Sequence, residues 1–447
     1  MATKTKDPVV KKGSWVVKDR TYVLKGNRTP ITFTLASKHH SRNPLMWFDE
    51  EQGLNRELRY ASNQNSPFRD EQKGFSTLKH IVFRNGSLFV PKADQALQKL
   101  LSLYHPQKNL TYYEADSVAE AKDDLQDLIS WVTNTSEGRT VYEEFLNTHR
   151  SEYPSYVEEL IGMSEGANVS FVDVFCNNLI LEMTSLKNPP GHIGGVDDCS
   201  DYSMCTNEFC GVAHNEDDAS PSLNKTAMIA ATFGTDGHRF VGFTYLGDLT
   251  SGAFGFNSYG IAFTLNWVGP TNVLRGGIGR GFVSRSMLDA RSLDDAIARA
   301  TVKNQCAGHN YQIMDVVNRR VVNIETAPGW TFGIQEIVQP YFHANQYELL
   351  KVSEHFDNSS VHRIRRVHEM SVPRNASALL NVLGDQHDEQ YPIFHDELSH
   401  ARGELSDWTM ATALFDLDTK TMNMYHGNPK NGSIMYQYDL LSTIINA

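Results

Sequence analysis

Residues 197–218, with the sequence DDCSDYSMCTNEFCGVAHNEDD, concentrate side chains that could do chemistry. The segment holds three of the chain's five cysteines, Cys199, Cys205 and Cys210, and it ends in a histidine followed by amide and carboxylate side chains. Four uses fit such a composition: a metal site, a disulfide, an acidic surface loop, or a nucleophile set opposite the groups that orient it. The spacing of the residues separates these uses.

A metal site is not expected in this segment. Zinc sites usually hold cysteines in pairs two to four residues apart, with a second pair of ligands elsewhere. Here five and four residues separate the three cysteines, and Cys176 and Cys306 lie far away without partners at paired spacing. We therefore predict no metal and no cofactor. A disulfide between two of the three cysteines stays open, although it leaves an odd thiol.

The pattern of the segment is that of a β-hairpin, with CSDYSMC and VAHNED as strands around the turn-rich TNEFCG. The start of the first strand then lies beside the end of the second, so we expect Cys199 to face Asn215 and Asp217. A thiol is a good nucleophile only after it loses its proton. If the chain were cut between Asp198 and Cys199, the freed α-amine, with an ordinary pKa of about 7.7 to 8, could serve as the base. The hairpin alone favours the other interpretation, a buried structural cysteine followed by a solvated acidic loop.

Composition places the chain among ordinary soluble globular proteins, since 40% of its 447 residues are hydrophobic, 10% aromatic and 21% charged. Its length suggests two or three domains. The net charge of −12 is uneven: residues 1–128 carry 20 Lys and Arg against 15 Asp and Glu, and residues 129–447 carry 21 against 38. This contrast predicts an N-terminal module over residues 1–128. Its basic residues are scattered, so we expect no nucleic-acid partner.

The cysteine count and the hydropathy bear on the compartment. An odd and sparse set of five cysteines favours a reducing, cytoplasmic location. No apolar run approaches the roughly 18 residues of a membrane span, and the start MATKTKDPVV has no hydrophobic export segment, so no membrane partner is expected. Nine Asn-x-Ser/Thr sequons, against roughly four expected by chance, keep secretion open.

The elements that must position the hairpin follow from periodicity. Residues 1–128 contain short β-like runs, and a helical pattern covers 115–132. Helices continue from about residue 140 to 186, strands alternate with turns to residue 270, and a helix is expected over 281–300 before more strands. Strands on both sides of a helical block predict an α+β fold built of layers. The Gly-rich run RGGIGRG matches neither nucleotide-binding signature and is expected to be a turn and helix start.

Several motifs occur in one order over residues 140–447. They are the helical segment YPSYVEELIGMSEGANVSFVDVFCNNLILE, the pair Cys199-Ser200 with Asn215 and Asp217 at 16 and 18 residues beyond it, GAFGFNSYGIAFTLN, NYQIMDVVNRRVVNIETAPG, HANQYE, and LGDQHDEQYPIFHDE with TMATALFDLDTKTMNMYHGNP as C-terminal strands. In these motifs the chain resembles the cysteine N-terminal nucleophile hydrolases related to acyl-coenzyme A:6-aminopenicillanic acid acyltransferase and β-alanyl-dopamine hydrolase.

The resemblance implies an αββα sandwich, the N-terminal nucleophile hydrolase fold, preceded by a separate β-containing module. Residues 129–198 would be a leading, propeptide-like segment and residues 199–447 the catalytic domain. Self-cleavage between Asp198 and Cys199 would leave two fragments associated as a heterodimer. Cys199 would then form an acyl-enzyme with a small amide or thioester substrate.

The remaining roles are also implied by the resemblance. Asp217 would orient the α-amine, Asn215 would contact the amine or the substrate, and Asn345, with Asn266 as the weaker candidate, would supply the oxyanion donor. Cys205, Cys210 and the other acids of the segment would be bystanders. The implied function is a self-processing amidohydrolase or acyltransferase of a small N-acyl amine or peptide-like amide.

Two departures from the family pattern keep alternatives open. Asp198 stands where the family usually has Gly, and the strand that normally opens the leading peptide is not evident, so residues 1–139 either supply one or are a fusion. One alternative is an unprocessed, inactive scaffold. Another is a phage-associated structural or binding protein, because residues 55–74 and 89–106 weakly resemble small modules of tailed-phage proteins.

Overall fold

The computed structural model describes residues 119–187 and 199–446, except for 168, 220–221, 224, 234–237, 246, 251, 403–406 and 442–444. It also describes four strand segments of the N-terminal part, at 20–25, 30–36, 82–84 and 87–89. Asp198 and residues 55–74 lie outside the described residues. Of residues 89–106, the second segment that resembles a phage module, only Phe89 is described. In the described part of the chain, no helix is long and apolar enough to cross a membrane.

Two antiparallel sheets form the centre of the fold. The nine-stranded sheet has the order β1-β2-β7-β8-β9-β10-β11-β12-β13, with β1 (Arg20–Lys25), β2 (Pro30–Ala36), β7 (Thr226–Phe233), β8 (His238–Tyr245), β9 (Phe254–Asn257), β10 (Ile261–Trp267), β11 (His309–Asp315), β12 (Arg320–Ala327) and β13 (Thr331–Glu336). The seven-stranded sheet has the order β14-β5-β6-β15-β16-β17-β18, with β5 (Ser200–Cys205), β6 (Cys210–Ala219), β14 (Tyr341–His343), β15 (Asp407–Asp416), β16 (Thr421–His426), β17 (Ser433–Asp439) and β18 (Ile445–Asn446). A small hairpin, β3 (Val82–Arg84) with β4 (Ser87–Phe89), stands apart from both.

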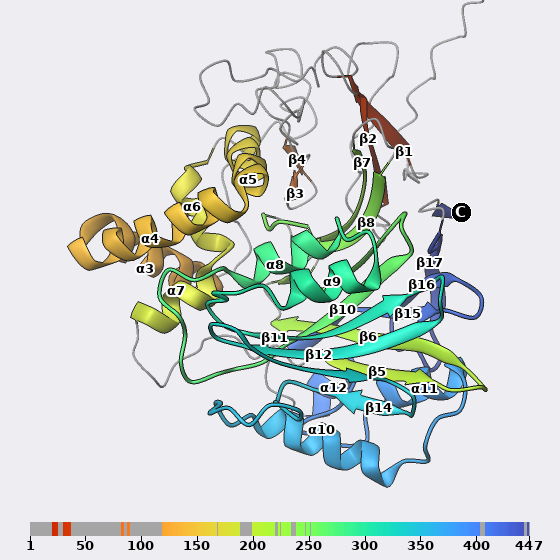
Figure 1. Ribbon diagram of the computed structural model, residues 1–447. Coiled ribbons are helices and arrows are strands. Elements are labelled where there is room, and N and C mark those ends of the chain that lie inside the picture. Colours follow the sequence, from red (N-terminus) through yellow and green to blue (C-terminus); the bar gives the residue numbers. More distant parts are fainter. Residues whose placement is uncertain are drawn as a thin grey trace, which may run out of the picture.

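Helices lie against the outer faces of both sheets (Figure 1). On the side of the nine-stranded sheet are α3 (Ala119–Asn134), α4 (Ser136–Glu152), α5 (Pro154–Ala167), α6 (Phe171–Asn177), α7 (Ile180–Lys187), α8 (Arg280–Met287) and α9 (Leu293–Ala300). On the side of the seven-stranded sheet are α10 (Asn358–Glu369), α11 (Ala376–Leu383) and α12 (Glu397–Arg402). The order of layers is therefore αββα, as predicted.

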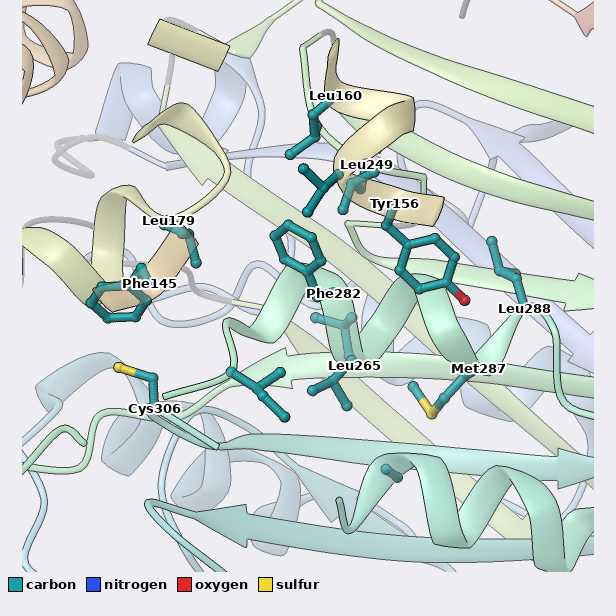
Figure 2. Close-up of a cluster of buried hydrophobic side chains, with 14 of the residues drawn as sticks. Phe145, Tyr156, Leu160, Leu179, Leu249, Leu265, Phe282, Met287, Leu288 and Cys306 are labelled. Atoms are coloured by element: carbon teal, nitrogen blue, oxygen red, sulfur yellow. The ribbon is translucent and has the colours of Figure 1, made fainter. Parts of the chain in front are cut away.

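Each interface between layers has its own apolar core. Side chains of α3–α8 pack on the outer face of the nine-stranded sheet, where Figure 2 shows Phe282 of α8 between Tyr156, Leu160 and Leu265. A second cluster, with members from β6, β8, β9 and β15, fills the space between the sheets. A third joins the seven-stranded sheet to α10 and α11. Truncating a fully buried Phe such as Phe282 typically costs about 3 to 5 kcal/mol, so the first cluster strongly couples the leading helices to the sheet.

Two sequence-based expectations need correction. The expected helix over 281–300 is two helices, because Ser292 caps a new helix by accepting a hydrogen bond from the backbone N–H of Asp295. Residues 383–397, expected among the C-terminal strands, instead connect α11 to α12.

The N-terminal strands bear on whether residues 1–128 are separate. β1 pairs with β2, and β2 pairs with β7 through the register Phe33↔Ala231. β1 and β2 of the N-terminal part thus extend the nine-stranded sheet. This pairing favours the alternative in which residues 1–139 supply the strand that normally opens the leading peptide. The extent of an independent N-terminal domain stays a prediction.

His149 of α4 links the leading helices to the start of α8. Its Nδ1 donates to the carbonyl of Phe145 at 2.7 Å, and its Nε2 accepts the backbone N–H of Gly279 at 2.9 Å. Only the neutral imidazole can make both bonds. Burial lowers the pKa of His149 to about 4, although the nearby Glu182 partly opposes this shift.

This pKa predicts an acid-sensitive contact. The histidine of the unfolded chain has a pKa of about 6.5, so the stability that the neutral ring contributes is complete above pH 6.5 and is lost as the pH falls through 4. We expect wild type to lose up to about 3 kcal/mol more than His149→Gln between these limits. Urea unfolding of both proteins at pH 7 and at pH 4.5 measures the difference. Equal losses in the two proteins would show that His149 is not the responsible group.

Candidate active site

The predicted hairpin is present and forms the second and third strands of the seven-stranded sheet, next to the edge strand β14. β5 pairs with β6 through Ser200↔Asn215 and Asp201↔His214, so the register continues to Cys199 opposite Glu216. β14 lies on the other side of β5, with His343↔Asp201. Cys199 immediately precedes β5, forms no disulfide within the described part of the chain, and is only 3% exposed.

The side chain opposite the thiol is that of Glu216, one position beyond the expected Asn215. Cys199 Sγ lies 3.5 Å from Glu216 Oε2 and 3.6 Å from the backbone oxygen of Asp217. The Asn215 side chain points to the other face, where it donates to the carbonyls of Leu383 and Ile393, both at 2.8 Å. Because neighbouring residues of a strand alternate between faces, a shift of one residue exchanges the face. The expectation that the thiol faces the Asn215 side chain was therefore wrong, and Glu216 is not a bystander.

A buried ionic network surrounds Glu216 on the face between the sheets. His214 donates from Nδ1 to Asp201 Oδ1 at 2.9 Å and from Nε2 to Glu216 Oε2 at 3.0 Å. Tyr245 of β8 donates to Glu216 Oε1 at 2.5 Å, and Thr264 of β10 donates to Asp201 Oδ1 at 2.8 Å. Burial alone would lower the pKa of His214, but the two carboxylates outweigh it and raise the pKa to about 10. Burial, with the charge of Glu216, holds the pKa of Tyr245 well above its usual value.

Arg363 of α10 connects Cys199 to Asn345. Its guanidinium donates to the carbonyl of Cys199 at 2.7 Å, to Ser200 Oγ at 2.9 Å and to Asn345 Oδ1 at 2.7 Å. The Arg363 side chain is fully buried. The register of β14 with β5, continued past His343, brings Asn345 level with Cys199, and Asn345 Nδ2 donates to the carbonyl of Trp267 at 3.1 Å. Arg363 thus joins the side chain of Asn345 to the backbone of Cys199, and the role of Asn345 as oxyanion donor stays a prediction.

Sequence reasoning did not find Arg363. It lies in VHRIRRVHE, where three arginines and two histidines on a short helix resemble a solvated face. Its one distinguishing signal is position: it falls on the same helical stripe as the buried Ser359, Ser360 and Val367, which form the inner face of α10.

Asn266 lies near this centre but faces β14. Its Nδ2 donates to the carbonyl oxygen of His343 at 3.3 Å, and its Oδ1 is buried without a hydrogen-bond partner among the described residues. His343 also contacts Glu325 Oε1 at 3.1 Å, and Glu325 accepts three backbone N–H groups from residues 348–350. Burial alone would raise the pKa of Glu325, but these hydrogen bonds lower it.

Asp217 occupies a buried position one residue beyond Glu216. Its carboxylate lies 3.8 Å from His395 Nε2, and both side chains are fully buried. Asp198, on the other side of the predicted cleavage bond, lies outside the described residues. The catalytic roles assigned to Asn215 and Asp217 therefore stay predictions.

The two other cysteines of the hairpin form a disulfide. Cys205 and Cys210 close the β5–β6 turn and are cross-strand partners in the hairpin register. These cysteines are therefore a structural clamp on the hairpin that carries Cys199. Their pairing also weakens the cysteine argument for a reducing compartment, and the cytoplasmic location stays a prediction.

One group of side chains in the described part of the chain could also hold a metal ion. The ligand atoms of Cys199, His214 and Glu216 all lie within 4.8 Å of one another, and all three residues are buried. The spacing of Cys199, His214 and Glu216 in the sequence did not indicate a metal site, because the pairing of β5 with β6 brings their side chains together.

Known proteins resemble this chain in sequence. The family model described as "Acyl-coenzyme A:6-aminopenicillanic acid acyl-transferase" matches residues 203–431, about half of the chain, beginning just after Cys199. A curated relative, the β-alanyl-dopamine/carcinine hydrolase of Drosophila melanogaster, is 24% identical over 319 residues, which cover 65% of this chain and 81% of the relative.

Two solved structures are also similar. An ortholog of N-acylethanolamine-hydrolyzing acid amidase from Caenorhabditis elegans matches at 12% identity with a TM-score of 0.33, covering 47% of this chain and 99% of its own. A mutant of the conjugated bile acid hydrolase from Clostridium perfringens matches at 12% identity with a TM-score of 0.24, covering 56% of this chain and 95% of its own.

Proposed function

Because the chain belongs to the acyl-coenzyme A:6-aminopenicillanic acid acyl-transferase family, and so is an amide hydrolase or acyltransferase, we propose that Cys199 is its nucleophile. The single observation that carries this assignment is the position of the thiol. It is buried at the start of β5, opposite Glu216, and its own backbone carbonyl is tied through Arg363 to the amide of Asn345.

We further propose that the chain processes itself at the bond between Asp198 and Cys199. The thiol attacks the carbonyl carbon of Asp198, the C–N bond breaks as the acyl group moves to sulfur, and water hydrolyses the thioester. The products are a carboxylate on Asp198 and a free α-amine on Cys199. An α-amine has an ordinary pKa of about 7.7 to 8, which suits a base near neutral pH.

In turnover the α-amine takes the thiol proton, and the thiolate attacks the carbonyl of the substrate. The oxyanion that forms needs a fixed donor, for which the second N–H of the Asn345 amide is suited, because Arg363 holds the amide oxygen and Trp267 accepts only one N–H. The leaving amine departs with a proton, and water or a second amine then releases the acyl group from Cys199. Asp217 orients the α-amine, and Asn266 is the second candidate donor.

The two fragments are proposed to stay together as a heterodimer after cleavage. Phe145 and Leu160 of the leading helices, and Leu179 in the turn between α6 and α7, pack in one core with α8 and the nine-stranded sheet (Figure 2). Buried ion pairs cross the same boundary, from Glu182 to Arg280 and from Glu159 to Arg285. Separating the fragments would expose this core and leave both pairs uncompensated.

The proposed substrate is a small N-acyl amine, of the kind named for the Drosophila relative. Asp201 and Glu216 on the thiol side carry two negative charges against the one positive charge of His214 between them, and the remaining negative charge suits an acyl group that carries an ammonium, such as β-alanyl.

An assay with matched amides tests this function. We expect purified protein to release dopamine from N-β-alanyl-dopamine faster than from N-acetyl-dopamine, which lacks the ammonium, as followed by liquid chromatography with mass detection. Loss of release in Cys199→Ala assigns the activity to the thiol. Equal rates on the two amides would refute the cationic acyl group, and no release from any N-acyl amine would refute the substrate class.

A further inference from the structure

Cys199, His214 and Glu216 form a compact set of ligand atoms on the inner face of the β5–β6 hairpin. Sγ of Cys199 lies 3.5 Å from Glu216 Oε2, and Nε2 of His214 lies 3.0 Å from the same oxygen. A tetrahedral Zn²⁺ with bonds of about 2.3 Å to sulfur and about 2.0 to 2.1 Å to nitrogen and oxygen places its ligand atoms about 3.3 to 3.5 Å apart. The two separations that involve Glu216 Oε2 differ from these values by at most a few tenths of an ångström, and all three ligand atoms lie within 4.8 Å of one another.

The surroundings of the three ligands fit a metal site as well as the distances do. Zinc-bound histidines usually donate their other ring N–H to a carboxylate, which fixes the ring and raises its basicity. His214 does so to Asp201 at 2.9 Å, and Thr264 steadies that carboxylate at 2.8 Å. Tyr245 binds Oε1 of Glu216, so the ion would take Oε2 and replace the hydrogen bond that His214 Nε2 now donates to that oxygen. The register of β5 with β6 places the three ligands and Asp201 on one face of the hairpin.

We propose that Cys199, His214 and Glu216 bind one Zn²⁺ and that this ion inhibits the enzyme by capturing the nucleophile. Binding forms bonds from the metal to Sγ, Nε2 and Oε2, with a water as the fourth ligand. The thiol and the imidazolium each release one proton to solvent, and no electron is transferred. Binding depends only on this geometry, whereas the inhibition rests on the proposed function of Cys199.

Titration of metal-free protein with Zn²⁺ in a calorimeter tests the site without reference to turnover. We expect one ion per chain, with affinity weakened roughly tenfold or more in His214→Gln and in Glu216→Gln. His238→Gln is the matched control, because His238 also lies beside a carboxylate, Asp289 at 3.2 Å, but has no thiol in its cluster. Its affinity for Zn²⁺ should equal that of wild type.

Cd²⁺ identifies the sulfur ligand, because a thiolate bound to this ion gives a charge-transfer band in the ultraviolet. The band should be present in wild type and absent in Cys199→Ser. Absence of Zn²⁺ binding, unchanged binding in His214→Gln, or binding of Cd²⁺ without the band would overturn the site. Binding of Zn²⁺ by a protein that hydrolyses no amide would leave the site standing and refute the proposed function alone.

Discussion

Cys199→Ala is expected to leave the chain at 50.3 kDa and to abolish amide turnover. Without the thiol, neither the carbonyl of Asp198 nor that of a substrate meets a nucleophile, and loss of an enzyme's nucleophile typically lowers kcat on the order of 10⁴-fold or more. Denaturing gels and the amine-release assay measure the two effects on one preparation.

Cys306→Ala is the matched control, because Cys306 is also a free, buried cysteine but lies in the core beneath the leading helices (Figure 2). We expect it to cleave and to turn over as wild type does. If Cys199→Ala retained turnover, or if a variant of Cys205 lost it while the fold persisted, a different residue would be the nucleophile.

Asn345→Asp is expected to lower kcat about 100-fold. The substitution keeps the size of the side chain and its bond to Arg363, but it replaces the N–H donor by a carboxylate oxygen that repels the developing oxyanion. Because the effect arises in the transition state, KM should change little while kcat falls. The variant also loses the bond from Asn345 Nδ2 to the carbonyl of Trp267, so a lower thermal unfolding midpoint is expected and is measured beside the kinetics.

The same change at Asn266 separates the two candidate donors. Asn266 Nδ2 contacts His343, so Asn266→Asp is expected to cost less kcat than Asn345→Asp. A loss under about fivefold in Asn345→Asp, with a large loss in Asn266→Asp, would reverse the two assignments.

Local pattern predicted the elements of the site well. The alternation of CSDYSMC and VAHNED around a turn predicted the hairpin that the structure shows, whereas Asn345 was selected only through the family resemblance of HANQYE. The layered α+β fold also followed from the grouping of strands around helices.

The sequence pattern did not predict the register of the hairpin or the contacts between distant parts of the chain. A hairpin pattern does not fix which residue opposes Cys199, and a shift of one position replaced Asn215 by Glu216. Arg363 reaches Cys199 across 164 positions of the chain, from a helix whose composition is that of a surface. The disulfide between Cys205 and Cys210 forms because the same register makes the two residues cross-strand partners. The number of cysteines in the sequence does not reveal that pairing.

The N-terminal residue of the purified protein tests the central claim most directly. Self-processing predicts, by Edman sequencing and intact mass, a 249-residue fragment that begins with Cys199, together with a fragment that ends at Asp198. An uncut chain of 50.3 kDa that still releases amine from N-acyl amines would contradict the account, because Cys199 would then have no α-amine to act as its base.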